Sequence, residues 1–220
     1  MAFRSTKLIS LLTILTLAIT GSAFADTVKI GSLSAVTGPI AKLVPPIING
    51  SKLAIKQINA SGGILNGKKL ELIVGDTGCN AQASVDAATK LVNVEQVVAI
   101  VGALCSGATI GAANNVAIPS NVVMVSPAST SPEITGLKDN DLIFRVAPTD
   151  AYQGKVLARY VIDKGIKSVA VTYVNNDYGV GLAETFSSAY EALGGKITGQ
   201  EKHEDKKASY RAELATLAKG

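Results

Sequence analysis

The stretch Val97–Asn114, VVAIVGALCSGATIGAAN, decides the fold. Its first five residues are apolar and mostly β-branched, which is typical of a buried strand, and Gly102 ends that run. The small residues that follow predict a helix packed closely on a sheet, with Ser106 as its N-cap. Such a helix leaves free backbone N–H groups at the carboxyl edge of the sheet, where they favour an anion. An ordinary capped helix explains the stretch equally well.

The first 25 residues have the pattern of a secretory signal peptide. Arg4 and Lys7 precede the apolar run Leu8–Ile19, and Ala23–Ala25 has the small-residue cleavage pattern. We therefore expect cleavage before Asp26 and an exported, soluble, periplasmic protein. The apolar run is too short for a transmembrane anchor.

The charge balance of the chain gives no sign of a nucleic-acid partner. Its formal net charge is +4, and removal of two basic residues with the leader lowers this to about +2. The densest basic stretch, Lys202–Lys207, also holds two acids, so it is expected to be a solvated face.

Two cysteines, Cys79 and Cys105, each follow a predicted parallel strand and should emerge at the same edge of the sheet. In an oxidising compartment a disulfide is the expected state, with a reactive thiol as the alternative. Two cysteines and one histidine give poor support for a zinc site, so we expect neither metal nor cofactor.

Outside the opening stretch the chain alternates predicted strands with predicted helices, which indicates an α/β fold. The other expected strands are Val28–Leu33, Leu70–Val74, Val122–Val125, Leu142–Val146, Ser168–Val174 and, with a weaker pattern, Ile197–Gln200. The other expected helices are Pro45–Ala60, Ala81–Val94, a helix that is capped by Asp150 or Thr149 and runs to about Lys164, Tyr178–Leu193 and Ser209–Lys219.

A new strand-and-helix pattern begins after Val146–Thr149, which suggests a crossover between two lobes. The expected domains are a signal peptide over 1–25, most of lobe one over 26–146 and the start of lobe two over 147–220. The second lobe has too few strands to cover its helices, so we expect it to be truncated.

A second polar loop, Ser126–Pro132, follows the strand Val122–Val125. Its prolines exclude a helix, and it presents hydroxyls at the same sheet edge as Ser106. An ordinary polar turn is the alternative, but the pair of hydroxyl-rich loops favours a shared binding site.

Motifs of catalysis are incomplete in this sequence. The turn Tyr178–Gly181 is similar to a dinucleotide fingerprint, yet Glu184 stands at the place of the third glycine. His203, the only histidine, lies in a polar stretch and has no partner motif for a triad. We therefore expect a binding protein rather than an enzyme. Tyr178 is placed to close over a ligand, with a solvent-facing turn tyrosine as the alternative.

Several segments, in this order and spacing, resemble the type I periplasmic binding proteins of ABC transporters, in their leucine/isoleucine/valine-binding branch. They include VKIGSLSAVTGPIA at 28–41, GALCSG at 102–107, SPASTSPE at 126–133 and NNDYGVGLAE at 175–184. The resemblance implies two Rossmann-like lobes, joined by three crossover strands, that close on a ligand by a hinge motion. It implies a monomer that captures an amino acid and delivers it to a membrane permease.

The resemblance also implies the residues of the site. Ser106 would hold the α-carboxylate of the ligand through its N–H and its hydroxyl. The Ala128 carbonyl and the Thr130 hydroxyl would hold the α-ammonium, with Ser129 lining the pocket and Tyr178 covering the ligand.

The resemblance pairs Cys79 with Cys105 in a disulfide. Selectivity for the side chain of the ligand is expected to come from apolar walls such as Leu104. The acid of lobe two that pairs with the ammonium in this family would lie beyond Gly220. Leu43 stands where the branched-chain binders carry a tyrosine, so the side chain of the ligand stays open. The alternative is a sensor of the same fold for amides, urea or aromatic acids.

Overall fold

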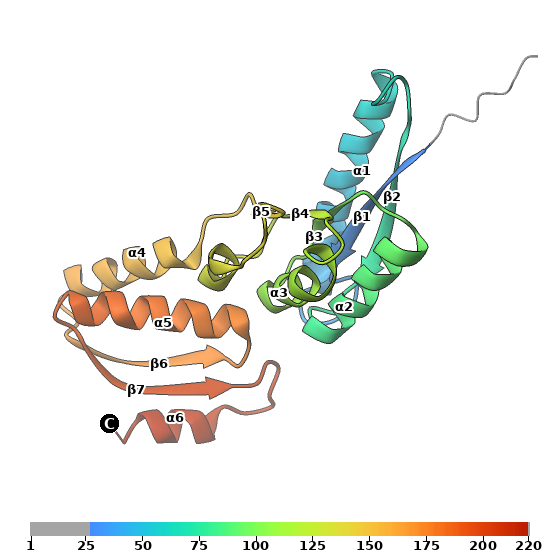
Figure 1. Cartoon of the computed structure of the whole chain (residues 1–220). Helices are drawn as coiled ribbons and strands as arrows, with labels where there is room; N and C mark the ends of the chain where they lie inside the picture. The colour runs from blue at the N-terminus through green and yellow to red at the C-terminus, as the bar shows by residue number, and fades with distance from the viewer. Residues whose placement is uncertain (1–26, 220) are drawn as a thin grey trace, which may run out of the picture.

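The computed structural model describes residues 27–219, so the predicted signal peptide and its cleavage site lie outside the described residues. The described chain forms two groups of elements, each with its own parallel sheet (Figure 1). We call residues 27–145 lobe one and residues 150–219 lobe two. Within residues 27–219 no helix is both long enough and apolar enough to cross a membrane.

Lobe one contains a five-stranded sheet in the order β2-β1-β3-β4-β5, and every neighbouring pair is parallel. The strands are β1 (Val28–Ser34), β2 (Leu70–Asp76), β3 (Ala99–Gly102), β4 (Val123–Ser126) and β5 (Ile143–Arg145). The order reverses between β1 and β3, so the loops after these strands diverge and leave a crevice at the carboxyl edge.

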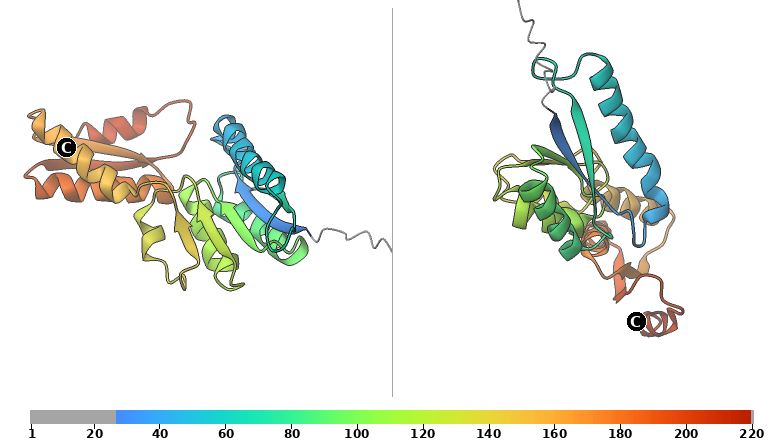
Figure 2. Two further views of the ribbon diagram at one scale, coloured as in Figure 1. Left: turned by 90° about the horizontal axis from the view of Figure 1, so that it is seen from above. Right: turned by 90° about the vertical axis from the view of Figure 1, so that its right-hand side faces the viewer.

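The helices of lobe one cover both faces of this sheet. Figure 2 shows α1 (Val44–Ala60) on one side, and α2 (Ala81–Thr89) and α3 (Ser106–Ala112) on the other. The lobe also contains the 3-10 helices η1 (Ala41–Leu43) and η4 (Pro132–Gly136). The π-helical segments η2 (Lys90–Val94) and η3 (Ala113–Ala117) continue α2 and α3.

The core of lobe one lies between the sheet and the pair α2 and α3. Leu33, Ile100 and Met124 of the strands pack there against Ala108 and Ala112 of α3, all fully or almost fully buried. The small side chains let α3 approach closely, as the sequence predicts. Gly111 shows how close the helices are, because an added Cβ there would lie 3.0 Å from the Ala81 carbonyl oxygen.

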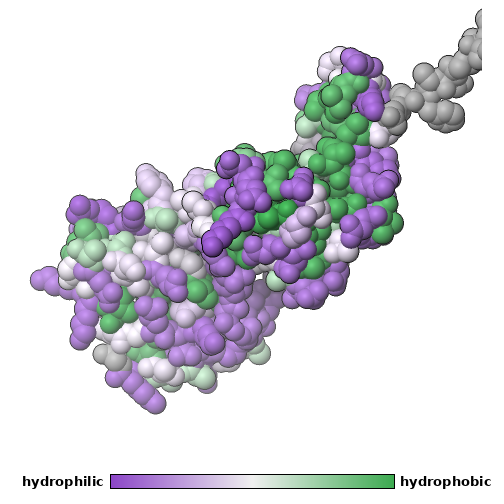
Figure 3. Space-filling model, in the orientation of Figure 1, coloured by the Kyte–Doolittle hydropathy of each residue, from purple (hydrophilic) through white to green (hydrophobic). Residues whose placement is uncertain are grey.

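Helix α1 buries only part of its apolar stripe. Its first turns pack through Val44 and Ile47 onto the loops of the sheet edge, but Leu53 is 54% exposed and Ile58 is 36% exposed. Figure 3 shows hydrophobic residues gathered on the surface along this helix. The helix runs beside the edge pair β1 and β2, so only part of its apolar stripe finds a partner.

Lobe two contains the parallel pair β6 (Ser168–Val174) and β7 (Lys196–His203). Helices α4 (Asp150–Asp163) and α5 (Asp177–Ala192) lie on one side of this pair, and α6 (Arg211–Leu217) lies on the other (Figure 1). Phe186 and Tyr190 of α5 stack with ring centroids 5.5 Å apart, and the Tyr190 hydroxyl donates to the Ile166 carbonyl at 2.8 Å. The hydrogen bond to Ile166 joins α5 to the segment that leads into β6.

Candidate functional site

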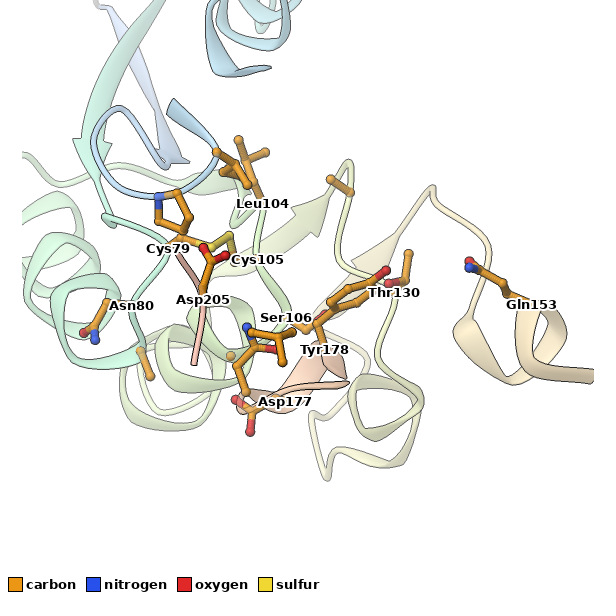
Figure 4. Close-up of a pocket in the computed structure, with 17 residues that line it drawn as sticks. Cys79, Asn80, Leu104, Cys105, Ser106, Thr130, Gln153, Asp177, Tyr178 and Asp205 are labelled. Carbon is orange, nitrogen blue, oxygen red and sulfur yellow. A yellow bond between two sulfur atoms is a disulfide. The ribbon is translucent and has the colours of Figure 1, made fainter. Parts of the chain in front are cut away.

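A cavity of about 600 Å³ lies between the two lobes. Its walls are the loops that follow β1, β2, β3 and β4 in lobe one, and β6 and β7 in lobe two, together with the first turn of α4. Five of the six residues proposed from the sequence line it, namely Leu104, Ser106, Ala128, Thr130 and Tyr178. Figure 4 shows Ser106, Thr130 and Tyr178 around the same space, with Gln153 set apart on α4.

Ser129 is the proposed residue that does not line the cavity. It is buried behind the cavity, where its hydroxyl lies 2.6 Å from the Thr109 hydroxyl and 3.2 Å from the Ala103 carbonyl oxygen. The Ser126 hydroxyl donates to the same carbonyl at 2.6 Å and accepts from the Ser129 N–H at 2.9 Å. These bonds fix the Ser126–Ser131 loop against the end of β3, so Ser129 supports the loop that carries Thr130.

Ser106 is not the N-cap of α3, contrary to the sequence prediction. Cys105 occupies the cap position without a side-chain bond, and Ser106 is the first helical residue. The Ser106 hydroxyl accepts a hydrogen bond from the Ser131 N–H at 3.2 Å. Because this bond uses only a lone pair, the hydroxyl proton of Ser106 stays free for donation into the cavity.

The Thr130 hydroxyl has the opposite hydrogen-bonding role, as an acceptor rather than a donor toward the cavity, and we call this difference opposite polarity. It donates to a carboxylate oxygen of Asp150 at 2.8 Å, and the Asp150 N–H donates to the Thr130 carbonyl at 2.9 Å. Since the single hydroxyl proton of Thr130 is occupied, only its oxygen lone pairs can act on a ligand. The cavity thus presents one hydroxyl free to donate, at Ser106, and one that accepts, at Thr130.

Asp150 itself was predicted only as one of two possible caps of α4. The structure gives that cap to Thr149, whose side chain accepts from the Ala151 N–H at 3.3 Å. Burial raises the pKa of Asp150, and the hydrogen bond from Thr130 and the nearby charge of Arg145 reduce this shift without reversing it.

Other polar residues of the cavity wall were not proposed from the sequence. They are Asn80, Gln153, Asn176, Asp177 and Asp205. Asn80 and Asn176 cap α2 and α5, so their positions after predicted strands were the available signal. Among the described lining residues two are acidic and none is lysine, arginine or histidine. The wall therefore favours a ligand that carries a positive group.

The predicted disulfide joins Cys79 to Cys105, with their Cα atoms 5.4 Å apart. It ties the loop after β2 to the start of α3, and both cysteines line the cavity. No group of three or more histidine, cysteine, aspartate or glutamate side chains is placed to hold a metal ion in the part of the chain that the structure describes.

Comparison with known proteins identifies the family. A family model described as periplasmic binding protein matches residues 27–219. The leucine-, isoleucine-, valine-, threonine- and alanine-binding protein of Pseudomonas aeruginosa is 36% identical over 177 residues, which are 80% of this chain and 46% of that protein.

Two solved structures also match closely. The leucine-binding protein LivK of Thermotoga maritima has a TM-score of 0.78 at 27% identity, over 87% of this chain and 53% of that one. The branched-chain amino acid binding protein LivJ of Streptococcus pneumoniae was solved with isoleucine. It has a TM-score of 0.74 at 31% identity, over 89% of this chain and 55% of that one.

The chain spans about half the length of the curated relatives it matches. Over that span its parallel sheets and covering helices match the type I periplasmic binding protein fold. The chain belongs to the periplasmic binding protein family.

Proposed function

We propose that this protein captures an amino acid, branched-chain or similar, in the cavity between its lobes and delivers it to a membrane permease of an ABC transporter. It would act in the periplasm, as a monomer, after removal of the signal peptide before Asp26. The observation that carries this proposal is the opposite polarity of the Ser106 and Thr130 hydroxyls, because an amino acid is a zwitterion.

In this proposal the ligand carboxylate accepts hydrogen bonds from the N–H and the hydroxyl of Ser106. The ligand ammonium donates to the Thr130 hydroxyl oxygen and the Ala128 carbonyl. Each hydrogen bond to a charged group contributes about 1.5–3 kcal/mol. Leu104 and the ring of Tyr178, which also line the cavity, would contact the apolar side chain of the ligand.

The names of the relatives support this proposal. The Pseudomonas aeruginosa protein is described as binding leucine, isoleucine, valine, threonine and alanine, and the Streptococcus pneumoniae structure holds isoleucine. These ligands share the α-ammonium and α-carboxylate that the two hydroxyls are placed to meet.

The alternative is a sensor of the same fold for amides, urea or aromatic acids. A ligand without an ammonium would leave the Thr130 lone pairs facing the cavity without a donor, which is unfavourable once water is excluded. Leu43, whose identity motivated this alternative, is 66% exposed and is not part of the cavity wall.

The nucleotide-like turn near Tyr178 has a packing explanation. A Cβ on Gly179 would lie 2.7 Å from Cγ1 of Val174, and the Gly179 N–H is capped by the Asn176 side chain at 2.9 Å. The glycine is therefore required by the close approach of α5 to β6. We propose ligand binding without catalysis at this site.

Isothermal titration calorimetry tests the proposal with two matched ligands. L-Leucine carries both charged groups, whereas 4-methylpentanoate keeps the same side chain and carboxylate but lacks the ammonium. The proposal predicts tight binding of leucine and binding of 4-methylpentanoate weaker by about tenfold or more. Equal affinities, or binding of benzoate or urea in preference to leucine, would favour the alternative.

A further inference from the structure

Asp150 is a buried charge with too few partners. Its exposed fraction is 0%, and one carboxylate oxygen accepts from Thr130 while the other has no hydrogen-bond partner within residues 27–219. A buried carboxylate is unfavourable unless its oxygens are paired. The N-terminal end of the α4 dipole favours an acidic residue in this turn, but that effect does not require a fully buried carboxylate with one oxygen unpaired.

Two hydrogen bonds join Asp150 to Thr130. Asp150 holds Thr130 twice, since its N–H donates to the Thr130 carbonyl and its carboxylate accepts from the Thr130 hydroxyl. Arg145 holds the next residue from β5, because its guanidinium donates to the Ser131 carbonyl at 2.6 Å. The start of α4 and the end of β5 thus fix both the backbone and the side chain of the cavity loop.

The charge state of residue 150 decides whether the Thr130 hydroxyl donates or accepts a hydrogen bond in the cavity. An ionised carboxylate accepts only, so the Thr130 proton must point to Asp150 and the oxygen lone pairs are left for the cavity. A neutral amide in the same place can donate to the Thr130 oxygen, which frees the hydroxyl proton to point toward the ligand. That arrangement would oppose an ammonium group instead of accepting from it.

We propose that Asp150 is a positioning residue that sets the polarity of Thr130 and so makes the cavity selective for a ligand with an ammonium group. This inference rests on the proposed function and adds to it a residue that does not itself line the cavity. The competing explanation is that Asp150 only fastens α4 to lobe one.

The two explanations differ in their effect on stability. Burial raises the pKa of Asp150, which means that the ionised form is less favourable in the folded protein than in the unfolded chain. One buried oxygen of Asp150 has no hydrogen-bond partner among the described residues, and burying an unpaired charged oxygen costs more than burying an amide of the same shape. Asp150→Asn should therefore fold at neutral pH at least as well as the wild type. A purely fastening role requires the opposite, because loss of the bond would lower the melting temperature.

The experiment is a double-mutant cycle on the full chain with L-leucine as the probe, using Asp150→Asn, Thr130→Val and both together. We expect Asp150→Asn to weaken leucine binding about tenfold or more and to leave the melting temperature of the unliganded protein unchanged or higher. In the Thr130→Val background Asp150→Asn should cause no further loss, because its effect acts through the hydroxyl. Asp163→Asn, the same substitution at the exposed far end of α4, is the matched control. It should change neither the leucine affinity nor the melting temperature.

Wild-type affinity for leucine in Asp150→Asn would overturn the inference. So would a further loss of affinity when Asp150→Asn is added to Thr130→Val, or a lower melting temperature in Asp150→Asn. If Asp150→Asn does not fold, the prediction that it is at least as stable as the wild type is wrong. The effect of the carboxylate on leucine binding is then measured with Asp150→Ser, and wild-type affinity in that variant would overturn the inference. Failure of the wild-type protein to bind leucine is a separate result that overturns the proposed function.

Discussion

The Thr130 hydroxyl donates to the Asp150 carboxylate across 2.8 Å, and this bond joins the cavity loop of lobe one to the first helix of lobe two. At the next residue of the same loop, the Ser131 N–H donates to the Ser106 hydroxyl at 3.2 Å. Together the two bonds give the cavity a donor and an acceptor before any ligand arrives. Such prior orientation strengthens binding because the groups need not be ordered when the ligand binds.

Removal of the Thr130 hydroxyl should weaken ligand binding more than it weakens the fold. Thr130→Ala removes one acceptor for the ligand ammonium, so we expect the leucine dissociation constant to rise about tenfold or more. The melting temperature of the unliganded protein should change little. Thr130→Ser keeps the hydroxyl and is the control, and equal affinity of Thr130→Ala and wild type in calorimetry would remove Thr130 from the site.

The disulfide between Cys79 and Cys105 should contribute much of the stability of lobe one. It closes a loop with a sequence separation of 26 residues, for which the chain-entropy model gives about 3–4 kcal/mol. We therefore expect the double substitution Cys79→Ser and Cys105→Ser to lower the denaturant midpoint by a corresponding amount. A reductant should lower the midpoint of the wild type but not that of the double variant, and an unchanged wild-type midpoint would contradict the prediction.

Asp76 should make lobe one sensitive to acid. Burial opposes ionisation of this carboxyl, but hydrogen bonds from the Thr37 hydroxyl and from backbone N–H groups, including those of Gly78 and Thr37, outweigh it and lower its pKa. A lowered pKa in the folded state means that the ionised group stabilises the fold above its ordinary pKa. This contribution is lost as the pH falls through the lowered value.

The measurement is the free energy of unfolding between about pH 6 and pH 2.5. The wild type should lose more stability over this range than Asp76→Asn, and Thr37→Val, which removes only the hydroxyl donor, should lie between them. Parallel curves for wild type and Asp76→Asn would show that the hydrogen bonds do not favour the ionised form.

Gly102 should not tolerate a side chain. Its φ of +137° is disfavoured for other residues, and an added Cβ would lie 2.8 Å from Cβ of Leu33 on the neighbouring strand. We expect Gly102→Ala to destabilise the protein by about 2 kcal/mol or more. Gly50→Ala, in α1 with open space around it, is the control and should be neutral or stabilising by up to about 1 kcal/mol. Similar melting temperatures for the two variants would contradict this view of β3.

The alternation of strands and helices and the meeting of the two hydroxyl loops could be predicted from the sequence, because parallel strands bring their carboxyl ends to one edge. The order of the strands in the sheet is seen only in the structure. The buried run Val97–Val101 and the small residues after it carried most of that information. The extent of β7 was harder to predict. It runs over Lys196–His203, beyond the expected Ile197–Gln200, because its second half is polar and lacks an apolar pattern.

The finer arrangement of the site could not be predicted from local pattern. Ser129 and Thr130 are neighbours with similar side chains, and only the packed loop shows that Ser129 faces Thr109 while Thr130 lines the cavity. The sequence likewise offers both Thr149 and Asp150 as helix caps. The bond from Thr130 to Asp150 depends on the crossover between lobes, and no local sequence rule reports that.

Native mass spectrometry of the protein purified without refolding tests the proposed binding function most directly, because it retains the ligand that the protein acquires in the cell. We predict an adduct with the mass of an amino acid, which is lost in the combined Thr130→Val and Asp150→Asn variant. A folded wild-type protein that carries no adduct and gains none in excess leucine, or one that carries a ligand without an amino group, would contradict the proposed function.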